Sequence, residues 1–187
     1  GVGYDWLYKE LTPEERMFLR AAIVKKGIQP WLDNIRGPGN LGRMGNNWVQ
    51  VCTGGITVGA LAIAEDEPKL AKEVIDDSRP IMKTIMELFG PDGGFEEGPT
   101  YWDYAVSYNV LYLAAMDTAL GTDFGLSDTQ GFAQTGDYRI QSLGPLWRAA
   151  NFSDAHEDVP RAFEMYWLAN RFHKPEYQIQ EDRKSVV

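Results

Sequence analysis

Three short stretches of the chain carry the side chains with the clearest potential for chemistry. They are RMGNNWVQVC at residues 43–52, GPDGGFEEGPTYWDYAVSYN at residues 90–109, and NFSDAHED at residues 151–158. Functional side chains concentrate on loops that a rigid scaffold positions, and the first two stretches each lead from a loop into a helix-forming segment. The three stretches are therefore candidate parts of a functional site.

The first stretch pairs two asparagines with a tryptophan. Asn46 and Asn47 stand where a glycine-rich loop becomes a helix, a position at which asparagine is among the best capping residues. On these residues alone, a helix cap is the favoured interpretation. A cap does not explain the second asparagine, which together with Trp48 offers a neutral amide donor and a stacking ring to a bound substrate.

The second stretch places acidic and aromatic side chains directly after a stiff glycine-proline turn. Tyr101, Tyr104 and Tyr108 are three and four residues apart and share one face of a helix, with Tyr101 at its start. These rings and Trp102 are typical of core packing, and Glu97 is typical of a helix N-terminus, where a carboxylate complements the dipole. Their position at a loop-to-helix junction favours substrate binding instead.

The carboxylates of this stretch permit a second interpretation, a glycoside hydrolase. Hydrolysis of a glycosidic bond requires an acid and a base on opposite sides of the sugar. Glu96 and Glu97 are adjacent, and a turn usually points adjacent side chains in different directions. Glu97 would therefore need Asp103 or Asp154 as its partner, although nothing in the spacing demands either.

A third interpretation is a helical domain that binds carbohydrate without reacting with it. Trp48, Trp102 and Tyr104 would then stack on sugar rings. The remaining candidate is His156, one of only two histidines in the chain. A lone histidine in a polar loop is usually solvated, and we weigh it as a substrate-binding residue because it titrates near neutral pH.

Helices must position these stretches, and apolar residues at three- and four-residue steps predict six of them. Thr12 before Pro13 marks a helix start, Gly121 marks a stop, and a bend is expected near Pro30. No alternating strand pattern occurs. The predicted helices span residues 13–36, 48–64, 68–89, 101–120, 129–142 and 159–173.

More buried and more exposed helices alternate along the chain, which predicts an all-α fold. Residues 1–187 are expected to form a single domain of antiparallel helical hairpins. Such hairpins build an incomplete α/α toroid, whose long loops gather around a cleft. An irregular helical bundle would give the same periodicity, so the pattern leaves both architectures open.

Composition and charge limit the class of partner. The chain has 187 residues with 44% hydrophobic side chains, a net charge of −9 and a pI near 4.7, which disfavours a nucleic-acid partner. No apolar run is long enough for a membrane span, so no membrane partner is expected. Cys52 is the only cysteine, which excludes an internal disulfide and a zinc cluster of cysteine and histidine. No cofactor and no metal ion are expected.

The stretches NNWVQVCTGGITVGALAIAEDE and PDGGFEEGPTYWDYAVSYN together resemble the heparinase II/III-like family of polysaccharide lyases. The chain is also similar to the oligoalginate lyases of the same architecture. The resemblance covers roughly Tyr4 to Arg171, and EGPTYWDY is its more specific motif. It implies an α/α toroid followed by a β-sandwich domain. That second domain is absent from this chain, which is therefore expected to be an inactive fragment of a longer lyase.

The resemblance implies β-elimination at uronic-acid residues of an acidic polysaccharide or oligosaccharide. In that chemistry a donor neutralises the substrate carboxylate, a base removes the neighbouring proton, and an acid protonates the leaving oxygen. The family pattern matches Asn47 to the donor and Tyr101 to the base and acid. It also implies a periplasmic or secreted location and a catalytic histidine in the β-sandwich domain. His156 is not expected to replace that histidine.

The negative charge of the chain argues against a heavily sulfated substrate such as heparin. This expectation would change if scattered arginines gathered into a local positive patch. The candidates for such a patch are Arg36, Arg43, Arg139 and Arg148. Without the patch, a less sulfated or purely uronic polymer is the expected substrate.

Overall fold

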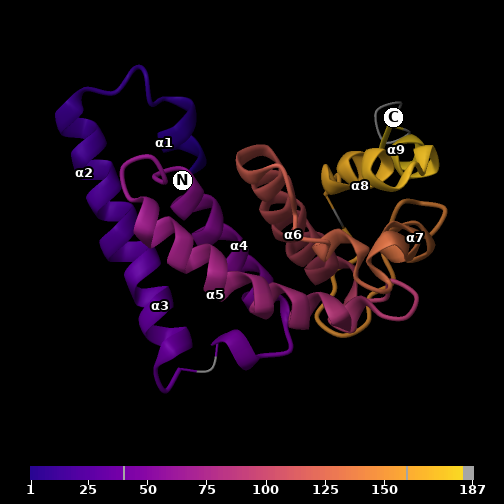
Figure 1. Ribbon diagram of the computed structural model, residues 1–187. Coiled ribbons are helices and arrows are strands. Elements are labelled where there is room, and N and C mark those ends of the chain that lie inside the picture. Colours follow the sequence, from indigo (N-terminus) through magenta and orange to yellow (C-terminus); the bar gives the residue numbers. More distant parts are fainter. Residues whose placement is uncertain (40, 159, 183–187) are drawn as a thin grey trace.

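The structure is a computed structural model that describes residues 1–39, 41–158 and 160–182 (Figure 1). These residues are mainly helical and contain no β-strand, apart from an isolated antiparallel bridge between Leu143 and Ala149. The predicted all-α class is confirmed.

A long helical rod forms one side of the molecule (Figure 1). It consists of α2 (Pro13–Ile23), a π-helical segment η1 (Val24–Ile28) and α3 (Gln29–Arg36), preceded by the short α1 (Val2–Trp6). The predicted start is confirmed as a capping box, in which Glu15 N donates to Thr12 Oγ1 at 3.2 Å and Thr12 N donates to Glu15 Oε2 at 2.8 Å. The wide π turn ends just before Pro30, whose ring would clash with the carbonyl oxygen four residues earlier in an α-helix.

The centre of the molecule is built from α4 (Asn47–Leu61), α5 (Pro68–Met86) and α6 (Gly98–Leu120). Leu61 at the end of α4 lines a surface depression with Ala71 near the start of α5. Val49 near the start of α4 lines another with Ile85 near the end of α5, so α4 and α5 are antiparallel. By contrast, α4 and α6 run parallel, because Asn47 contacts Glu97 and Gly54 lies against Tyr108. A Cβ atom on Gly54 would lie 2.9 Å from the Tyr108 carbonyl oxygen, so glycine permits this close approach.

The boundaries of these three helices differ slightly from the sequence expectations. Helix α6 begins three residues before Tyr101 and ends as predicted at Gly121, which has a φ of 72°. Helix α5 continues through Pro80 and closes with the 3₁₀ turn η3 (Glu87–Phe89). Helix α4 ends at Leu61 rather than near residue 64.

The C-terminal third gathers at the other end of the molecule from the rod (Figure 1). It contains η4 (Leu126–Asp128), η5 (Phe132–Gln134), α7 (Thr135–Gln141), α8 (Glu164–Phe172) and α9 (Pro175–Asp182). The helices predicted at 129–142 and 159–173 are therefore shorter than expected, and Val159 lies outside the described residues. Helix α9 was not predicted. Tyr177 anchors it, because its buried ring carries a hydroxyl that donates to the Ala133 carbonyl oxygen at 3.1 Å.

Candidate functional site

The first two candidate stretches meet at the N-terminal ends of α4 and α6. The backbone N–H of Asn47 donates to Glu97 Oε2 at 2.7 Å. The side-chain Nδ2 of Asn47 lies 3.1 Å from Oε1 and 3.2 Å from Oε2 of the same carboxylate. Fifty residues separate the two side chains in the chain, so the contact ties two parallel helices together at their starts.

This contact corrects the interpretation of the asparagines as a helix cap. Asn46 occupies the N-cap position of α4 with an extended backbone, but its side chain makes no capping hydrogen bond. The orphan N–H at the start of α4 is satisfied instead by Glu97 from the neighbouring helix. A carboxylate at this position also complements the positive end of the α4 dipole. Asn47 is only 3% exposed, whereas Glu97 is half-buried.

The third candidate stretch docks on the first turn of α6. The backbone N–H of His156 donates to Thr100 Oγ1 at 2.8 Å. Gly98 has a φ of 86°, and a Cβ atom there would lie 2.7 Å from the Phe152 carbonyl oxygen. Ser153, with a φ of 53°, places a strained residue in the same loop. The structure thus brings parts of all three stretches to the shared start of α4 and α6. Neither Gly98 nor Thr100 was singled out from the sequence.

Two of the predicted aromatic side chains are well exposed at this end. Trp48 in the first turn of α4 is 57% exposed, and Tyr104 in the second turn of α6 is 44% exposed. Tyr104 meets the partly buried Tyr108 edge to face, with ring centroids 5.5 Å apart, as their four-residue spacing predicted. The pKa of Tyr104 is raised, first by loss of solvent and then by Tyr108 and Cys52. Trp48 and Tyr104 are therefore available to stack on a ligand.

Trp102 is not available to stack on a ligand, which corrects its assignment to substrate binding. Its ring is fully buried, and its Nε1 donates to Thr135 Oγ1 at 2.7 Å. The Thr135 hydroxyl in turn donates to the Gly93 carbonyl oxygen at 2.9 Å, so Trp102 joins α6 to α7 and to the turn before α6. Tyr101, the next residue back, is partly buried and packs against the same core cluster.

The carboxylates proposed for hydrolysis have separate partners. Glu97 binds Asn47, whereas Asp103 forms a side-chain hydrogen bond with Glu164 of α8. Glu164 is almost fully buried, and its pKa is raised to about 9, first by burial and then by the charge of Asp103. Asp154 is exposed in the loop beside α6. Glu164 was not predicted from the sequence. Its position in the apolar helix at residues 164–172 was a signal that this carboxyl group could be buried.

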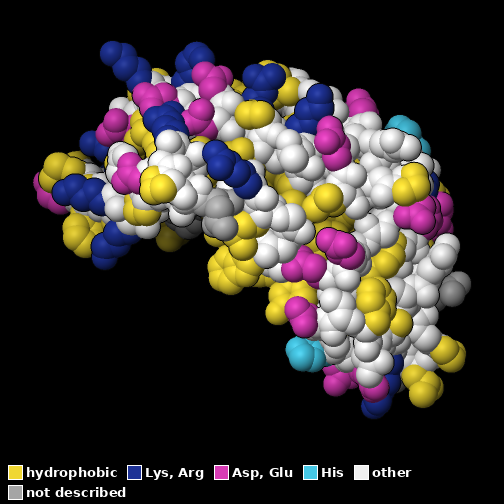
Figure 2. Space-filling model, turned by 90° about the horizontal axis from the view of Figure 1, so that it is seen from below, with side chains coloured by type: hydrophobic (Ala, Val, Ile, Leu, Met, Phe, Trp, Pro, Cys, Tyr) yellow, Lys and Arg dark blue, Asp and Glu magenta, His cyan; other side chains and the backbone are white. Residues whose placement is uncertain are grey.

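Charges around the site disfavour a heavily sulfated substrate. In Figure 1 α4 and α6 begin at their lower ends, and Figure 2 views the molecule from below as a crescent hollowed on one side. Hydrophobic and acidic side chains gather along the inner edge of this hollow (Figure 2). Three of the four arginines considered for a positive patch are buried or paired, which argues against such a patch. Arg139 is buried. Arg36 pairs with Asp77 and Arg148 pairs with Glu157, both at hydrogen-bond distance.

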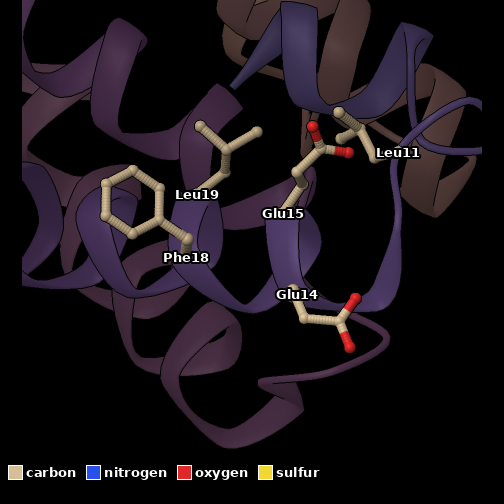
Figure 3. A pocket seen from close by; sticks show the side chains of 5 residues that line it. All are labelled: Leu11, Glu14, Glu15, Phe18 and Leu19. Atoms are coloured by element: carbon tan, nitrogen blue, oxygen red, sulfur yellow. The ribbon is translucent and has the colours of Figure 1, made fainter.

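An apolar depression on the outside of α2 is separate from this site. Figure 3 shows its lining, which comes from α2 and the residue just before the cap. Phe18 is 73% exposed there, and Glu15 is already engaged in the capping box. None of its lining residues belongs to the starts of α4 or α6, so we assign it no part in the candidate site. The lining residues are Leu11, Glu14, Glu15, Phe18 and Leu19.

Two kinds of feature are missing from the described part of the chain. Its histidine, cysteine, aspartate and glutamate side chains form no group of three or more that could hold a metal ion. Within residues 1–39, 41–158 and 160–182, no helix has the length and apolar character needed to cross a membrane. In comparisons with known proteins, no family model and no curated protein matches the chain.

Proposed function

We propose that this chain is the catalytic helical domain of a polysaccharide lyase that cleaves uronic-acid-containing polysaccharide by β-elimination. The observation that carries the proposal is the meeting of the asparagine stretch, the tyrosine helix and the histidine loop at one end of α4 and α6. These stretches are far apart in the sequence, and each carries candidate side chains by its residue types alone. The parallel α4 and α6, with α5 antiparallel between them in the chain, also support the α/α toroid as the architecture.

The proposed reaction needs three functions from the protein. Asn47 hydrogen-bonds the carboxylate of the uronate, which makes the hydrogen on the adjacent carbon C5 more acidic. Tyr101, as the phenolate, takes that proton, and the electron pair of the C–H bond forms the C4–C5 double bond as the C4–O bond breaks. Tyr101 then returns the proton to the departing glycosidic oxygen. The reaction consumes no water and needs no change of oxidation state overall.

Trp48 and Tyr104 supply the proposed sugar-stacking surface beside these two residues, because both rings are exposed at the same end of the helix pair. The acidic side chains along the inner edge of the hollow argue against heavy sulfation of the substrate. A β-sandwich domain in the longer parent protein and a periplasmic or secreted location belong to this proposal through the resemblance to the lyase family.

The substitution Tyr101→Phe in the full-length protein tests the proposal. The substitution removes the phenolic oxygen and keeps the ring, so we expect elimination to fall by about 100-fold or more while the fold is retained. Activity is followed by the ultraviolet absorbance of the unsaturated product on a panel of uronic-acid polymers. Tyr8→Phe, which makes the same change near α1, is the matched control and should retain activity.

Two outcomes would contradict the lyase proposal. New reducing ends without an unsaturated product, together with a severe loss in Glu97→Gln, would identify a hydrolase instead. Binding of uronic polymers without turnover in the full-length protein would identify a carbohydrate-binding domain.

A further inference from the structure

The amide that the proposed reaction assigns to the substrate is already occupied. Both the backbone N–H and the side-chain Nδ2 of Asn47 donate to the carboxylate of Glu97. A carboxylate is also the group of the substrate that Asn47 would bind. We call the backbone N–H and the side-chain Nδ2 of Asn47 the Asn47 cradle. In this structure the cradle binds a carboxylate, the group expected from the substrate, but that carboxylate belongs to the protein itself.

The two partners of this contact differ in freedom. Asn47 is the first residue of α4, and its buried side chain belongs to a helix that packs along α5 and α6. Glu97 lies at the N-cap of α6, is only half-buried, and reaches Asn47 through a long side chain with several rotatable bonds. Of the two, only the Glu97 side chain can move away by rotation about its own bonds, without moving a helix backbone.

Two carboxylates cannot share this cradle at low cost. Like charges placed together in a partly buried site repel strongly, and Asn47 brings only an uncharged amide and the backbone N–H to compensate them. Binding of a uronate to Asn47 and retention of Glu97 there are therefore mutually exclusive.

We propose that Glu97 is a built-in competitor whose carboxylate holds the Asn47 cradle closed until a uronate carboxylate displaces it. This inference rests on the proposed function. Before substrate binds, the contact keeps the Asn47 amide oriented and satisfied. It also sets specificity, because a neutral sugar brings no carboxylate to replace the hydrogen bonds that Glu97 gives up.

The test compares Glu97→Gln with the unaltered residue 97 by calorimetry, both in the full-length protein carrying Tyr101→Phe, so that the probes are bound but not cleaved. The probes are a tetrasaccharide of mannuronate, a hyaluronan tetrasaccharide, and the methyl ester of each. A neutral amide acceptor binds N–H groups about half as strongly as a carboxylate. We therefore expect the acidic probes to bind about tenfold tighter to Glu97→Gln, with little change for the esters. Glu96→Gln removes the same charge from the adjacent exposed residue and should leave both affinities unchanged.

Unchanged or weaker binding of the acidic probes to Glu97→Gln overturns the competitor role and leaves the lyase proposal standing. Equal tightening in Glu96→Gln also overturns it, since the cause would then be overall charge. If Glu97→Gln does not fold, Glu97→Asp replaces it, because it keeps the charge on a shorter side chain. The acidic probes should then bind to Glu97→Asp more tightly than to the protein that retains Glu97. Failure of every protein to bind any probe overturns the proposed function itself.

Discussion

Replacement of Glu164 by glutamine should make the stability of the protein much less dependent on pH. The carboxyl group of Glu164 is buried between α8 and α6 and forms a hydrogen bond with Asp103. Burial and the charge of Asp103 raise its pKa from an ordinary value of 4.5 to about 9. Glutamine mimics the protonated form, because its amide N–H can donate to Asp103 and it carries no charge.

The size of the effect follows from proton uptake. Between the two pKa values the unfolded chain is ionised at this residue, whereas the folded protein keeps the proton. The contribution of Glu164 to the free energy of unfolding is therefore greatest below its pKa in the unfolded chain. It is lost as the pH rises toward its pKa in the folded protein. The loss is at most about 1.4 kcal/mol per pH unit, or about 2.7 kcal/mol from about pH 5.5 to about pH 7.5.

Urea unfolding at both pH values measures this difference. The urea midpoint of Glu164→Gln minus that of wild type should be larger at the higher pH than at the lower pH, by about 1 M urea. The exposed Glu176→Gln is the matched control and should track the wild type at both pH values. Asp103→Asn should reduce the effect, because it removes a charge that raises the Glu164 pKa. A pH-independent gap between Glu164→Gln and wild type would refute a protonated Glu164.

Two further substitutions test how the start of α6 is held, and a third, at the other end of α6, is the control for the first. Gly98→Ala forces a side chain into a φ of 86° and against the Phe152 carbonyl oxygen, and we expect a loss of about 2–4 kcal/mol in urea unfolding. Gly121→Ala, where φ is 72° but nothing lies within 4 Å, should cost only about 1–2 kcal/mol, and equal losses would contradict the predicted clash. Trp102→Phe leaves a cavity and removes the hydrogen bond to Thr135, so the melting temperature should fall, with a loss of about 1–3 kcal/mol. An unchanged melting temperature would contradict the core role of this ring.

Local signals in the sequence were sufficient to predict most of the helices. Thr12 and Gly121 mark their helix ends through capping chemistry that depends on neighbouring residues only. The same kind of signal could have separated the aromatic residues of α6. Trp102 is four residues before Val106 and is in phase with the apolar stripe, whereas Tyr104 is not, and only Tyr104 is exposed.

Contacts between distant segments could not be predicted in this way. The capping of α4 by Glu97 depends on the parallel packing of two helices, which brings together Asn47 and Glu97, fifty residues apart in the sequence. The raised pKa of Glu164 depends on its burial and on Asp103, which is distant in the sequence and lies on another helix. Helix α9 has little apolar periodicity of its own. The burial of Tyr177 and the hydrogen bond from its hydroxyl to the Ala133 carbonyl oxygen arise only when the helix docks. Tertiary packing decides each of these features.

The most direct test of the central claim is a crystal structure of the full-length Tyr101→Phe protein with an oligouronate bound. The account predicts a uronate carboxylate within hydrogen-bond distance of Asn47 Nδ2, Glu97 turned away, and carbon C5 of that sugar facing position 101. A sugar bound elsewhere on the molecule, or a uronate at this end with Asn47 still held by Glu97, would contradict the account.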